Sequence, residues 1–248
     1  MLEVLIVPVL RDNYTYLVVD SPSRECLVID PPEVEPVLQR MEHEGLKPHA
    51  IWLTHHHNDH IAGVPGLLKH FQNLPVIGSA RDAQRIPQIT RSVKDGDVLE
   101  FGGEEASVLE VPGHAEGHVA YHFPKSAHLF CGDVIFGASC GAVFGNTYQE
   151  MYESVSRVSQ LPPETKLWVG HEYTKKNLLF AEAVLGEEAL KERKKAFKVP
   201  SVPLTLEEEL KTNAFMRLES PEVLSYVSQE PGDPEATFKA LRQAKDRF

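Results

Sequence analysis

Six consecutive side chains, His-His-His-Asn-Asp-His at residues 55–60, form the segment of this chain best suited to chemistry. Imidazole is the commonest metal ligand in proteins, and a carboxylate suits the same divalent ions. A solvated loop that happens to be rich in histidine is the simpler interpretation. However, further ligand-type residues recur downstream, each at the end of a short apolar run. We therefore interpret residues 55–60 as the main part of a metal site.

Four short apolar runs are each followed closely by a residue of the ligand type. The runs cover residues 50–54, 106–111, 128–132 and 167–169. If they are strands, their carboxyl ends are where ligand sites of α/β proteins lie. The residues that follow them are His55, His114 (after Pro112-Gly113), Asp133 and His171 (after Gly170).

The spacing divides these residues between two ions. In an extended loop, residues i and i+2 point the same way, so His55 and His57 can bind one ion together. Asp59 and His60 begin the next helix and can serve a second ion. Open positions for water on both ions are typical of a catalytic site. The predicted ligands are His55, His57 and His114 for one ion, Asp59, His60 and His171 for the other, and Asp133 between the two.

The ligand types also indicate which metal to expect. Histidine and aspartate without cysteine suit zinc, our first choice, and also iron or manganese. The three cysteines lack the spacing of a thiolate site or of a disulfide framework. Among the other histidines, His56 alternates away from its neighbours, and His118 is a candidate for supporting the ligands.

Hydrophobic periodicity predicts the elements that position these residues. Short alternating runs bounded by turn residues dominate the first two-thirds of the chain, and helical spacing dominates the remainder. We expect an α/β domain over residues 1–170 and a small helical domain over 171–248. The predicted strands are 4–9, 14–20, 25–30, 50–54, 76–78, 98–101, 106–111, 119–123, 128–132 and 167–169. The predicted helices are 34–44, 61–71, 148–160, 173–185, 187–197, 206–217, 222–227 and 235–246.

Composition limits the classes of partner. The formal net charge of −11 argues against nucleic acid as a partner. The apolar opening, residues 1–10, contains Glu3, is too short to span a bilayer and lacks a cleavage pattern, so it predicts a strand. We therefore expect a cytoplasmic protein, monomeric and away from membranes, that acts on a small molecule.

The motif series His-x-His-x-Asp-His, Pro-Gly-His, Gly-Asp and Gly-His resembles the metallo-β-lactamase superfamily. The resemblance implies a four-layer αββα sandwich with a binuclear metal centre at one edge, here followed by the small C-terminal α-helical domain. A closer resemblance is to the glyoxalase II (hydroxyacylglutathione hydrolase) family, and it covers essentially the whole chain. It rests on Asp12-Asn13-Tyr14, Thr54-His-His-His, Phe130-Cys-Gly-Asp133, Cys140-Gly141, Gly170-His-Glu-Tyr-Thr174, Asn177-Leu178, Phe180-Ala181, Asn213-Ala-Phe-Met-Arg217, Leu241-Arg242 and Lys245-Asp246.

The resemblance implies hydrolysis of a glutathione thioester such as S-lactoylglutathione, as in the detoxification of methylglyoxal. All seven ligands carry over, with Asp59 orienting a metal-activated water and Asp133 holding both ions. Tyr173, Arg242, Lys245 and Phe144 match residues on the glutathione side. One stretch departs: a basic residue of the family is Ala142 here, and its Glu-Gly is Gly145-Asn146. Loss of one charge-assisted contact costs about 1.5–3 kcal/mol, so glutathione binding is expected to be weaker, or the thioester to differ.

Other functions fit the same motifs less well. A glutathione persulfide dioxygenase of this superfamily uses one iron, whereas this chain keeps both sets of ligands. A hydrolase of another acyl thioester fits the altered stretch at Ala142. A lactonase would have no need of a C-terminal helical region that matches the glyoxalase II family, and a nuclease would need a basic surface. A non-catalytic metal-binding protein descended from the enzyme would have had no reason to keep every ligand.

Overall fold

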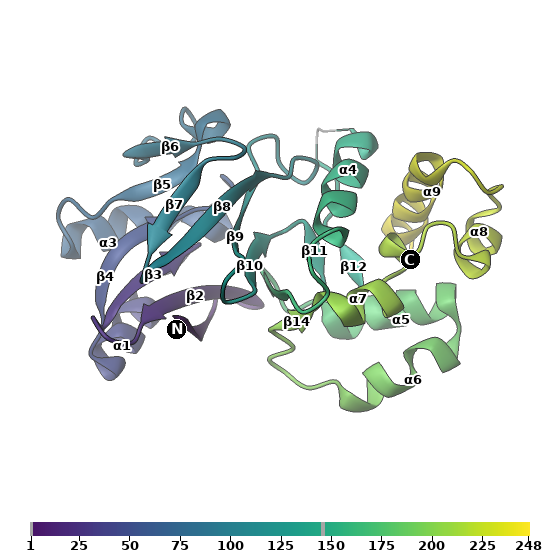
Figure 1. Ribbon diagram of the computed structural model, residues 1–248, viewed down its shortest axis with the longest axis horizontal. Helices are drawn as coiled ribbons and strands as arrows, with labels where there is room; N and C mark the ends of the chain where they lie inside the picture. The colour runs from purple at the N-terminus through teal and green to yellow at the C-terminus, as the bar shows by residue number, and fades with distance from the viewer. Residues whose placement is uncertain (1, 145–146) are drawn as a thin grey trace. The chain divides into compact units, whose positions relative to one another are not determined.

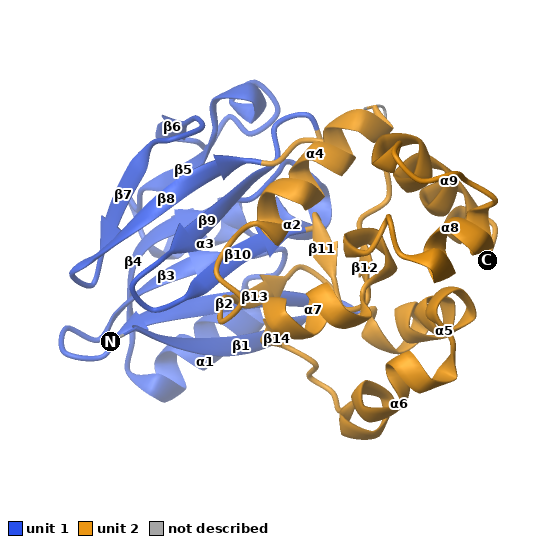
Figure 2. Cartoon of the chain, turned by 45° about the vertical axis from the view of Figure 1, so that its right-hand side comes forward, with its two compact units in different colours: residues 1–110, 116–132 blue, residues 111–115, 133–248 orange. Residues whose placement is uncertain are grey.

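The computed structural model describes residues 2–144 and 147–248, so the altered pair Gly145-Asn146 lies outside the described residues. The chain forms two compact units, shown in blue and orange in Figure 2. Unit 1 comprises residues up to 110 and residues 116–132, and unit 2 comprises residues 111–115 and 133–248. The division into domains at residue 170 stays a prediction.

Unit 1 contains ten strands and three α-helices among its described residues. Almost every predicted strand and helix of this region is present, with ends that differ by at most three residues. The elements are β1 (Leu2–Val9), β2 (Asn13–Asp20), β3 (Glu25–Ile29), α1 (Glu35–Glu44), β4 (Lys47–Trp52), α2 (Asn58–Ile61), α3 (Val64–His70), β5 (Val76–Ser79), β6 (Arg91–Val93), β7 (Val98–Phe101), β8 (Glu104–Glu110), β9 (Val119–Phe123) and β10 (His128–Gly132).

The first sheet of unit 1 has the strand order β1-β2-β3-β4-β5-β6 (Figure 1). Strands β1 to β3 are antiparallel neighbours, whereas β3 to β6 run parallel. Parallel neighbours need a crossover, and α1 and α3 supply it between β3 and β4 and between β4 and β5. Buried residues of both helices, such as Val37 and Leu67, join the same apolar cluster as Leu17 and Ile51 of the sheet. The helices therefore cover one face of this sheet.

The second sheet of unit 1 runs in the order β10-β9-β8-β7, with antiparallel neighbours. Aromatic rings fill the space between the two sheets. The Trp52 ring of β4 stacks on Phe123 of β9 with centroids 5.7 Å apart. Tyr16 of β2 packs on Phe130 of β10 at 5.8 Å. The Tyr121 hydroxyl donates to the carbonyl of Leu53 at 2.8 Å, which ties the sheets together beside the histidine run.

One helix predicted at residues 61–71 is wrong, because two short helices occupy this region. Helix α2 ends at Ile61, and α3 begins at Val64 with Pro65 in its first turn. Proline has no N–H to donate to the carbonyl four residues earlier, so a continuous helix would lose a bond there. The Gly63 N–H donates instead to the carbonyl of Pro31 at 3.0 Å. A Cβ at Gly63 would lie 2.7 Å from that oxygen, so only glycine allows this approach.

Unit 2 is mainly helical, and the buried rings of Phe180, Phe215 and Phe238 form part of its core. The helix predicted at 206–217 ends early because Asn213 adopts an extended backbone and caps the next turn through its side chain. The elements of unit 2 are β11 (Ile135–Phe136), β12 (Ser139–Cys140), α4 (Tyr148–Ser159), β13 (Lys166–Val169), α5 (Thr174–Leu185), α6 (Glu187–Ala196), β14 (Leu204–Thr205), α7 (Leu206–Thr212), α8 (Pro221–Val227) and α9 (Pro234–Asp246).

Within the described residues, every helix is too short or too polar to cross a membrane.

Candidate metal centre

The histidine run of unit 1 leaves strand β4 and leads into helix α2. His55 and His60 are each 1% exposed, whereas the Asp59 side chain is 43% exposed. His55 Nε2 lies 3.0 Å from His57 Nδ1, so the predicted i, i+2 pair does come together. His57 is the residue before α2, and Asp59 and His60 lie within the helix, as the sequence predicts.

Asp30, which the sequence analysis missed, holds the buried end of this run. It follows β3, is 3% exposed and accepts hydrogen bonds from the backbone N–H and the hydroxyl of Thr54 at 2.8 and 2.6 Å. Its Oδ2 also lies 3.0 Å from His60 Nδ1. A histidine whose Nδ1 is bound by a carboxylate presents Nε2 to a metal in a fixed orientation. The only signal in the sequence is an aspartate directly after a buried strand.

Asn13 at the start of β2 orients the Asp59 carboxylate. Its side-chain amide donates to the Asp59 backbone carbonyl at 3.0 Å and to Asp59 Oδ2 at 3.1 Å. The two bonds fix both the backbone and the side chain of Asp59. Because Asn13 is 5% exposed, little water competes for these bonds.

His56 is directed to a different partner. Its Nδ1 lies 3.1 Å from Oδ1 of Asp82, which is fully buried and also 3.2 Å from Arg85 Nη1. A Cβ on Gly117 would collide with the Asp82 carboxyl group, so the backbone at Gly117 packs directly on that carboxyl. Asp82 therefore connects the loop of His56 with the loop that leads to His118. The sequence analysis did not identify Asp82, because it lies in an unremarkable polar turn.

His118 supports the run from the second sheet. Its ring stacks on the His55 ring, with centroids 4.7 Å apart and an interplanar angle of 15°. Gly132 has a φ of +47°. A Cβ there would lie 2.5 Å from Thr54 Oγ1 and 2.8 Å from His118 Nε2. Glycine is thus required for β10 to end this close to the histidines.

Unit 2 contains a second group of ligand-type side chains, each about 5% exposed: His114, Asp133 and His171. Both His114 Nε2 and His171 Nε2 lie 3.3 Å from Asp133 Oδ2. His114 Nδ1 is bound by the backbone carbonyl of Ala142 at 2.9 Å, which directs Nε2 to the carboxylate. A carboxylate held between two imidazoles is the arrangement expected of a bridging ligand.

Local backbone geometry brings His114 to this position. Gly113 has a φ of +132°, and a Cβ there would lie 2.5 Å from the Cα of Met151 in α4. The chain before His114 therefore passes directly against α4. The hydroxyl of Ser154, also in α4, donates to the carbonyl of Pro112 at 2.5 Å and holds the loop in place.

Aromatic side chains flank the second group. The Tyr173 ring stacks on His171 with centroids 4.7 Å apart, and Phe136 packs edge-on against His171 at 5.9 Å. Phe144 is 60% exposed, and its ring lies 5.3 Å from that of His114. Tyr173 and Phe144, both predicted to contact substrate, are therefore beside two of the expected ligands.

Of the basic pair in helix α9, Arg242 is buried in unit 2 and Lys245 is partly buried. Arg242 is 5% exposed and donates to the carbonyl of Cys140 at 3.1 Å and to Asp246 at 2.7 Å. Lys245 Nζ donates to Asn177 Oδ1 at 2.7 Å. Burial, and then the nearby Arg242 charge, lower the pKa of Lys245 to about 8. Arg242 thus fixes the backbone at Cys140, and contact of either residue with substrate stays a prediction.

The donor set can hold divalent ions. The predicted ligand atoms are all histidine nitrogens and carboxylate oxygens. Three of the imidazoles are held in orientation by a neighbour: His60 by Asp30, His114 by the carbonyl of Ala142 and His55 by the ring of His118. These ligand types suit zinc, iron and manganese. The side chains therefore fit a resident metal in both groups.

Two known protein families match adjacent parts of the chain, residues 9–248 together. The family model described as "Metallo-beta-lactamase superfamily" matches residues 9–171, and that described as "Hydroxyacylglutathione hydrolase C-terminus" matches residues 172–248. A protein of Gloeobacter violaceus named hydroxyacylglutathione hydrolase is 43% identical over 246 residues, covering 96% of this chain and 97% of its own.

Solved structures show the same fold. The crystal structure of ETHE1 from Myxococcus xanthus aligns with a TM-score of 0.68 and 23% identity, covering 98% of this chain and 99% of its own. TTHA1623 in a di-iron-bound form aligns with a TM-score of 0.64 and 27% identity, covering 86% and 99%. The predicted metallo-β-lactamase-like sandwich with a C-terminal helical region is therefore confirmed.

Proposed function

Because the chain belongs to the hydroxyacylglutathione hydrolase family of the metallo-β-lactamase superfamily, we propose that it hydrolyses S-(2-hydroxyacyl)glutathione thioesters to glutathione and a 2-hydroxy acid. S-lactoylglutathione, an intermediate of methylglyoxal detoxification, is the expected substrate. The observation that carries this proposal is the family match over residues 172–248. The metal motifs alone are shared with lactamases, lactonases and nucleases, whereas this region is described by the hydrolase name itself.

Two divalent ions are the proposed cofactors, with zinc the first choice and iron or manganese the alternatives. When bound, they lower the pKa of a water molecule toward about 7 and polarise the thioester carbonyl. The donor chemistry of both groups supports the proposal. The proposed ligands are His55, His57 and His114 for one ion, Asp59, His60 and His171 for the other, and Asp133 for both.

Asp59 and Asp133 are the proposed catalytic carboxylates. Asn13 donates to Asp59 Oδ2 and holds the carboxylate in one orientation, so that Asp59 can orient a metal-activated water while it serves as a ligand. The leaving thiolate has a pKa near the ordinary value of about 8.5, so it departs without a strong general acid. An amide nitrogen would need protonation before it could leave. The chemistry of the site therefore favours a thioester over an amide.

The glutathione moiety is proposed to contact Tyr173, Phe144, Arg242 and Lys245. Exposed Phe144 offers an apolar surface next to His114, and Tyr173 lies on His171. Lys245 supplies a positive charge for a carboxylate of the tripeptide. Ala142, where the family has a basic residue, removes one such charge, so we expect a raised KM rather than a lowered kcat for glutathione thioesters.

The rival function is oxidation of glutathione persulfide. The likeness to ETHE1 at 23% identity concerns the fold alone. Oxygen uptake with glutathione persulfide, at a rate above that of thioester hydrolysis, would favour the rival. A hydrolase of another acyl thioester is the second alternative, and the departure at Ala142 supports it.

We also infer the setting in which the protein works. All three cysteines are free and buried, which suits a reducing compartment such as the cytoplasm. The net charge of −11 disfavours nucleic acid as a partner. We expect the protein to act on a small molecule, as a monomer and without a membrane as partner.

Metal analysis alongside hydrolysis rates tests the proposed function. The purified protein should contain two divalent ions per chain and hydrolyse S-lactoylglutathione faster than an acyl-coenzyme A thioester. Asp133→Ala should abolish hydrolysis. Near-normal turnover of that variant, with a full metal load, would exclude the assigned site. A faster rate with the non-glutathione thioester would redirect the substrate assignment and leave the metal chemistry intact.

A further inference from the structure

A hollow with unusual chemistry lies in unit 1, away from the histidine run. It has a volume of about 440 Å³ and is lined by four glutamates, a histidine and a phenylalanine, with the turn between β7 and β8 at its edge. No lysine or arginine lines it among the described residues. The side chains used below are Glu25, His49, Glu100, Phe101, Glu104 and Glu105.

Glu104 distinguishes this hollow from an ordinary acidic surface. The residue is 5% exposed, and its Oε2 accepts no hydrogen bond from any described residue. An ionised carboxylate buried without a donor is costly, so such groups usually have a cationic partner. Lys125, in the turn between β9 and β10, donates instead to the backbone carbonyl of Gly103 at 3.4 Å. No described residue forms a hydrogen bond with Glu104 Oε2, and the Glu104 side chain lines the hollow, where a cationic ligand can pair with its carboxyl group.

The other glutamates add to the negative charge of the hollow. Glu100 and Glu105 face each other directly across the β7–β8 hairpin, a pairing of like charges that weakens a sheet. Glu25 Oε2 lies 3.2 Å from His49 Nδ1, and both side chains are 47% exposed. The exposed glutamates thus add negative charge to the hollow that Glu104 also lines, and a bound cation would relieve that repulsion as well as pair with Glu104.

The shape of the hollow favours an organic cation over a metal ion. Among the described residues, groups of three histidine or carboxylate ligand atoms within 4.8 Å of one another do occur. None of these groups contains a residue that lines this hollow. A single ion would also occupy a small part of about 440 Å³. The rings of Phe101 and His49, with centroids 5.4 Å apart, offer an apolar wall to methylene groups. A chain of methylenes with separated positive charges matches both features.

We propose that this hollow binds an organic polycation, an alkyl chain that carries two or more ammonium groups. One ammonium pairs with Glu104, and a second pairs with the exposed glutamates. His49 lies at the start of β4, and His55 follows the end of that strand, about 20 Å farther along an extended chain. A ligand bound here is therefore remote from the proposed thioester site and does not compete with substrate.

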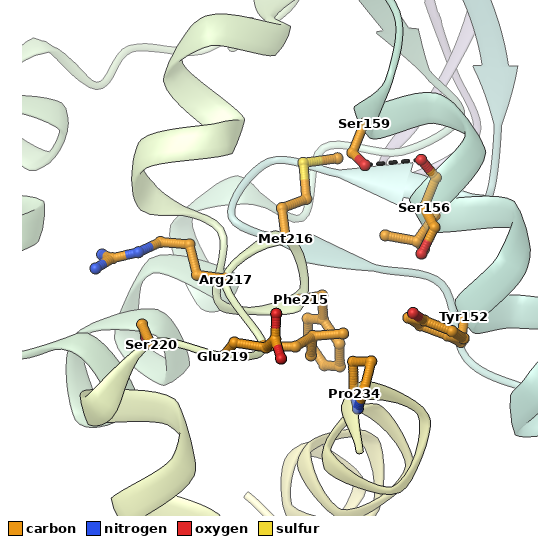
Figure 3. A pocket seen from close by; sticks show the side chains of 11 residues that line it. Tyr152, Ser156, Ser159, Phe215, Met216, Arg217, Glu219, Ser220 and Pro234 are labelled. Carbon is orange, nitrogen blue, oxygen red and sulfur yellow. Dashed lines mark hydrogen bonds between the residues drawn. The ribbon is translucent and has the colours of Figure 1, made fainter. Parts of the chain in front are cut away.

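A second hollow, in unit 2, provides a contrast. It has a volume of about 380 Å³ and is lined by α4, α9 and residues 215–220 (Figure 3). Its charged groups include both Arg217 and Glu219. Arg217 already donates to the carbonyl of Lys211 at 3.1 Å, and Ser159 donates to the carbonyl of Ser156 at 2.7 Å. This hollow carries charges of both signs, and these donors already have acceptors. It therefore shows no buried charge or donor that a ligand would have to pair with.

Calorimetric titration of the metal-loaded protein with spermidine, in buffer of physiological ionic strength, tests the proposal. One equivalent should bind, and Glu104→Gln should weaken the affinity at least tenfold. Glu192→Gln, which removes one exposed negative charge from α6, is the matched control and should leave the affinity unchanged. The KM and kcat for S-lactoylglutathione should not change when the protein is saturated with spermidine.

Each other outcome overturns the proposal. Equal spermidine affinity for wild type and Glu104→Gln would show that Glu104 is not the anchor. If Glu192→Gln weakened the spermidine affinity as much as Glu104→Gln does, the binding would be general attraction to the negative charge of the protein. Displacement of spermidine by stoichiometric MgCl₂ would assign the hollow to an inorganic ion. If Glu104→Gln unfolds, the double variant Glu25→Gln/Glu105→Gln, at two half-exposed or exposed positions, should weaken binding at least tenfold, and unchanged binding refutes the proposal.

Discussion

At the scale of single residues, the orientation of each ligand depends on a partner outside the ligand motif. The Asp30 carboxylate accepts three hydrogen bonds, two from Thr54 and one from His60. Replacing it by Asn removes the negative charge that fixes the His60 ring. We expect Asp30→Asn to weaken metal affinity about ten- to a hundredfold, measured by competition with a chromogenic chelator. Exposed His43→Gln is the control, and equal affinities for wild type and Asp30→Asn would contradict the role of Asp30.

The lowered pKa of Lys245 predicts that substrate binding depends on pH. Its pKa of about 8 lies below the ordinary value of 10.5. The ammonium is therefore charged below pH 8, and the charge is lost as the pH rises through that value. We expect KM for an anionic glutathione thioester to rise above pH 8, with little change in kcat. Lys245→Gln should have a high KM that does not vary between pH 7 and 9. A wild-type KM that is also constant over this range would exclude Lys245 as the anion contact.

A basic residue restored at position 142 should raise the affinity for glutathione thioesters. His114 contacts the backbone carbonyl of Ala142, so a change of side chain at this position keeps that hydrogen bond. Ala142→Arg should therefore lower KM for S-lactoylglutathione about tenfold or more, at nearly constant kcat. Ala142→Leu is the matched control for size without charge. An unchanged KM in the arginine variant would mean that this departure does not limit glutathione binding.

At the scale of elements, the strands that precede the ligands could be predicted, whereas most of the residues that support the ligands could not. Short apolar runs revealed β4, β8, β10 and β13, because buried strands need apolar side chains. Asp30, Asn13 and Asp82 come from three separate segments that only the folded chain brings to the histidine run. Nothing in the local sequence distinguishes Asp30 and Asp82 from ordinary turn residues, and Asn13 stands out only through the family motif Asp12-Asn13-Tyr14. The early end of α7 likewise depends on a contact of Asn213 with the distant Ser139 carbonyl at 2.9 Å.

Helix α7 is held by a buried ion pair. Glu209 is fully buried and binds Arg193, the backbone N–H of Ala138 and the Asn213 side chain. Glu209→Ala would remove the buried partner of the Arg193 charge and leave only the partly exposed Glu208 within ion-pair distance, at 3.5 Å. We expect the free energy of unfolding to fall by about 3–5 kcal/mol, measured by urea denaturation. Glu207→Ala, on the exposed side of the same helix, should leave the midpoint unchanged. A similar small effect of both variants would contradict a structural role for Glu209.

At the scale of the whole molecule, the proposed ions link binding to stability. A ligand that binds only the folded chain stabilises it by about 4 kcal/mol when present at a thousand times its Kd. For a chain of this size, that corresponds to a rise in Tm of about 8–16 °C. Chelation should therefore lower Tm by this amount and abolish hydrolysis, and stoichiometric zinc should restore both. Differential scanning calorimetry with parallel metal analysis measures the effect. Since Asp133 contacts both His114 and His171, chelation of Asp133→Ala should lower Tm much less than chelation of wild type. An equal Tm for metal-free and metal-loaded wild type, with the metal content verified, would show that the ions contribute nothing to the fold.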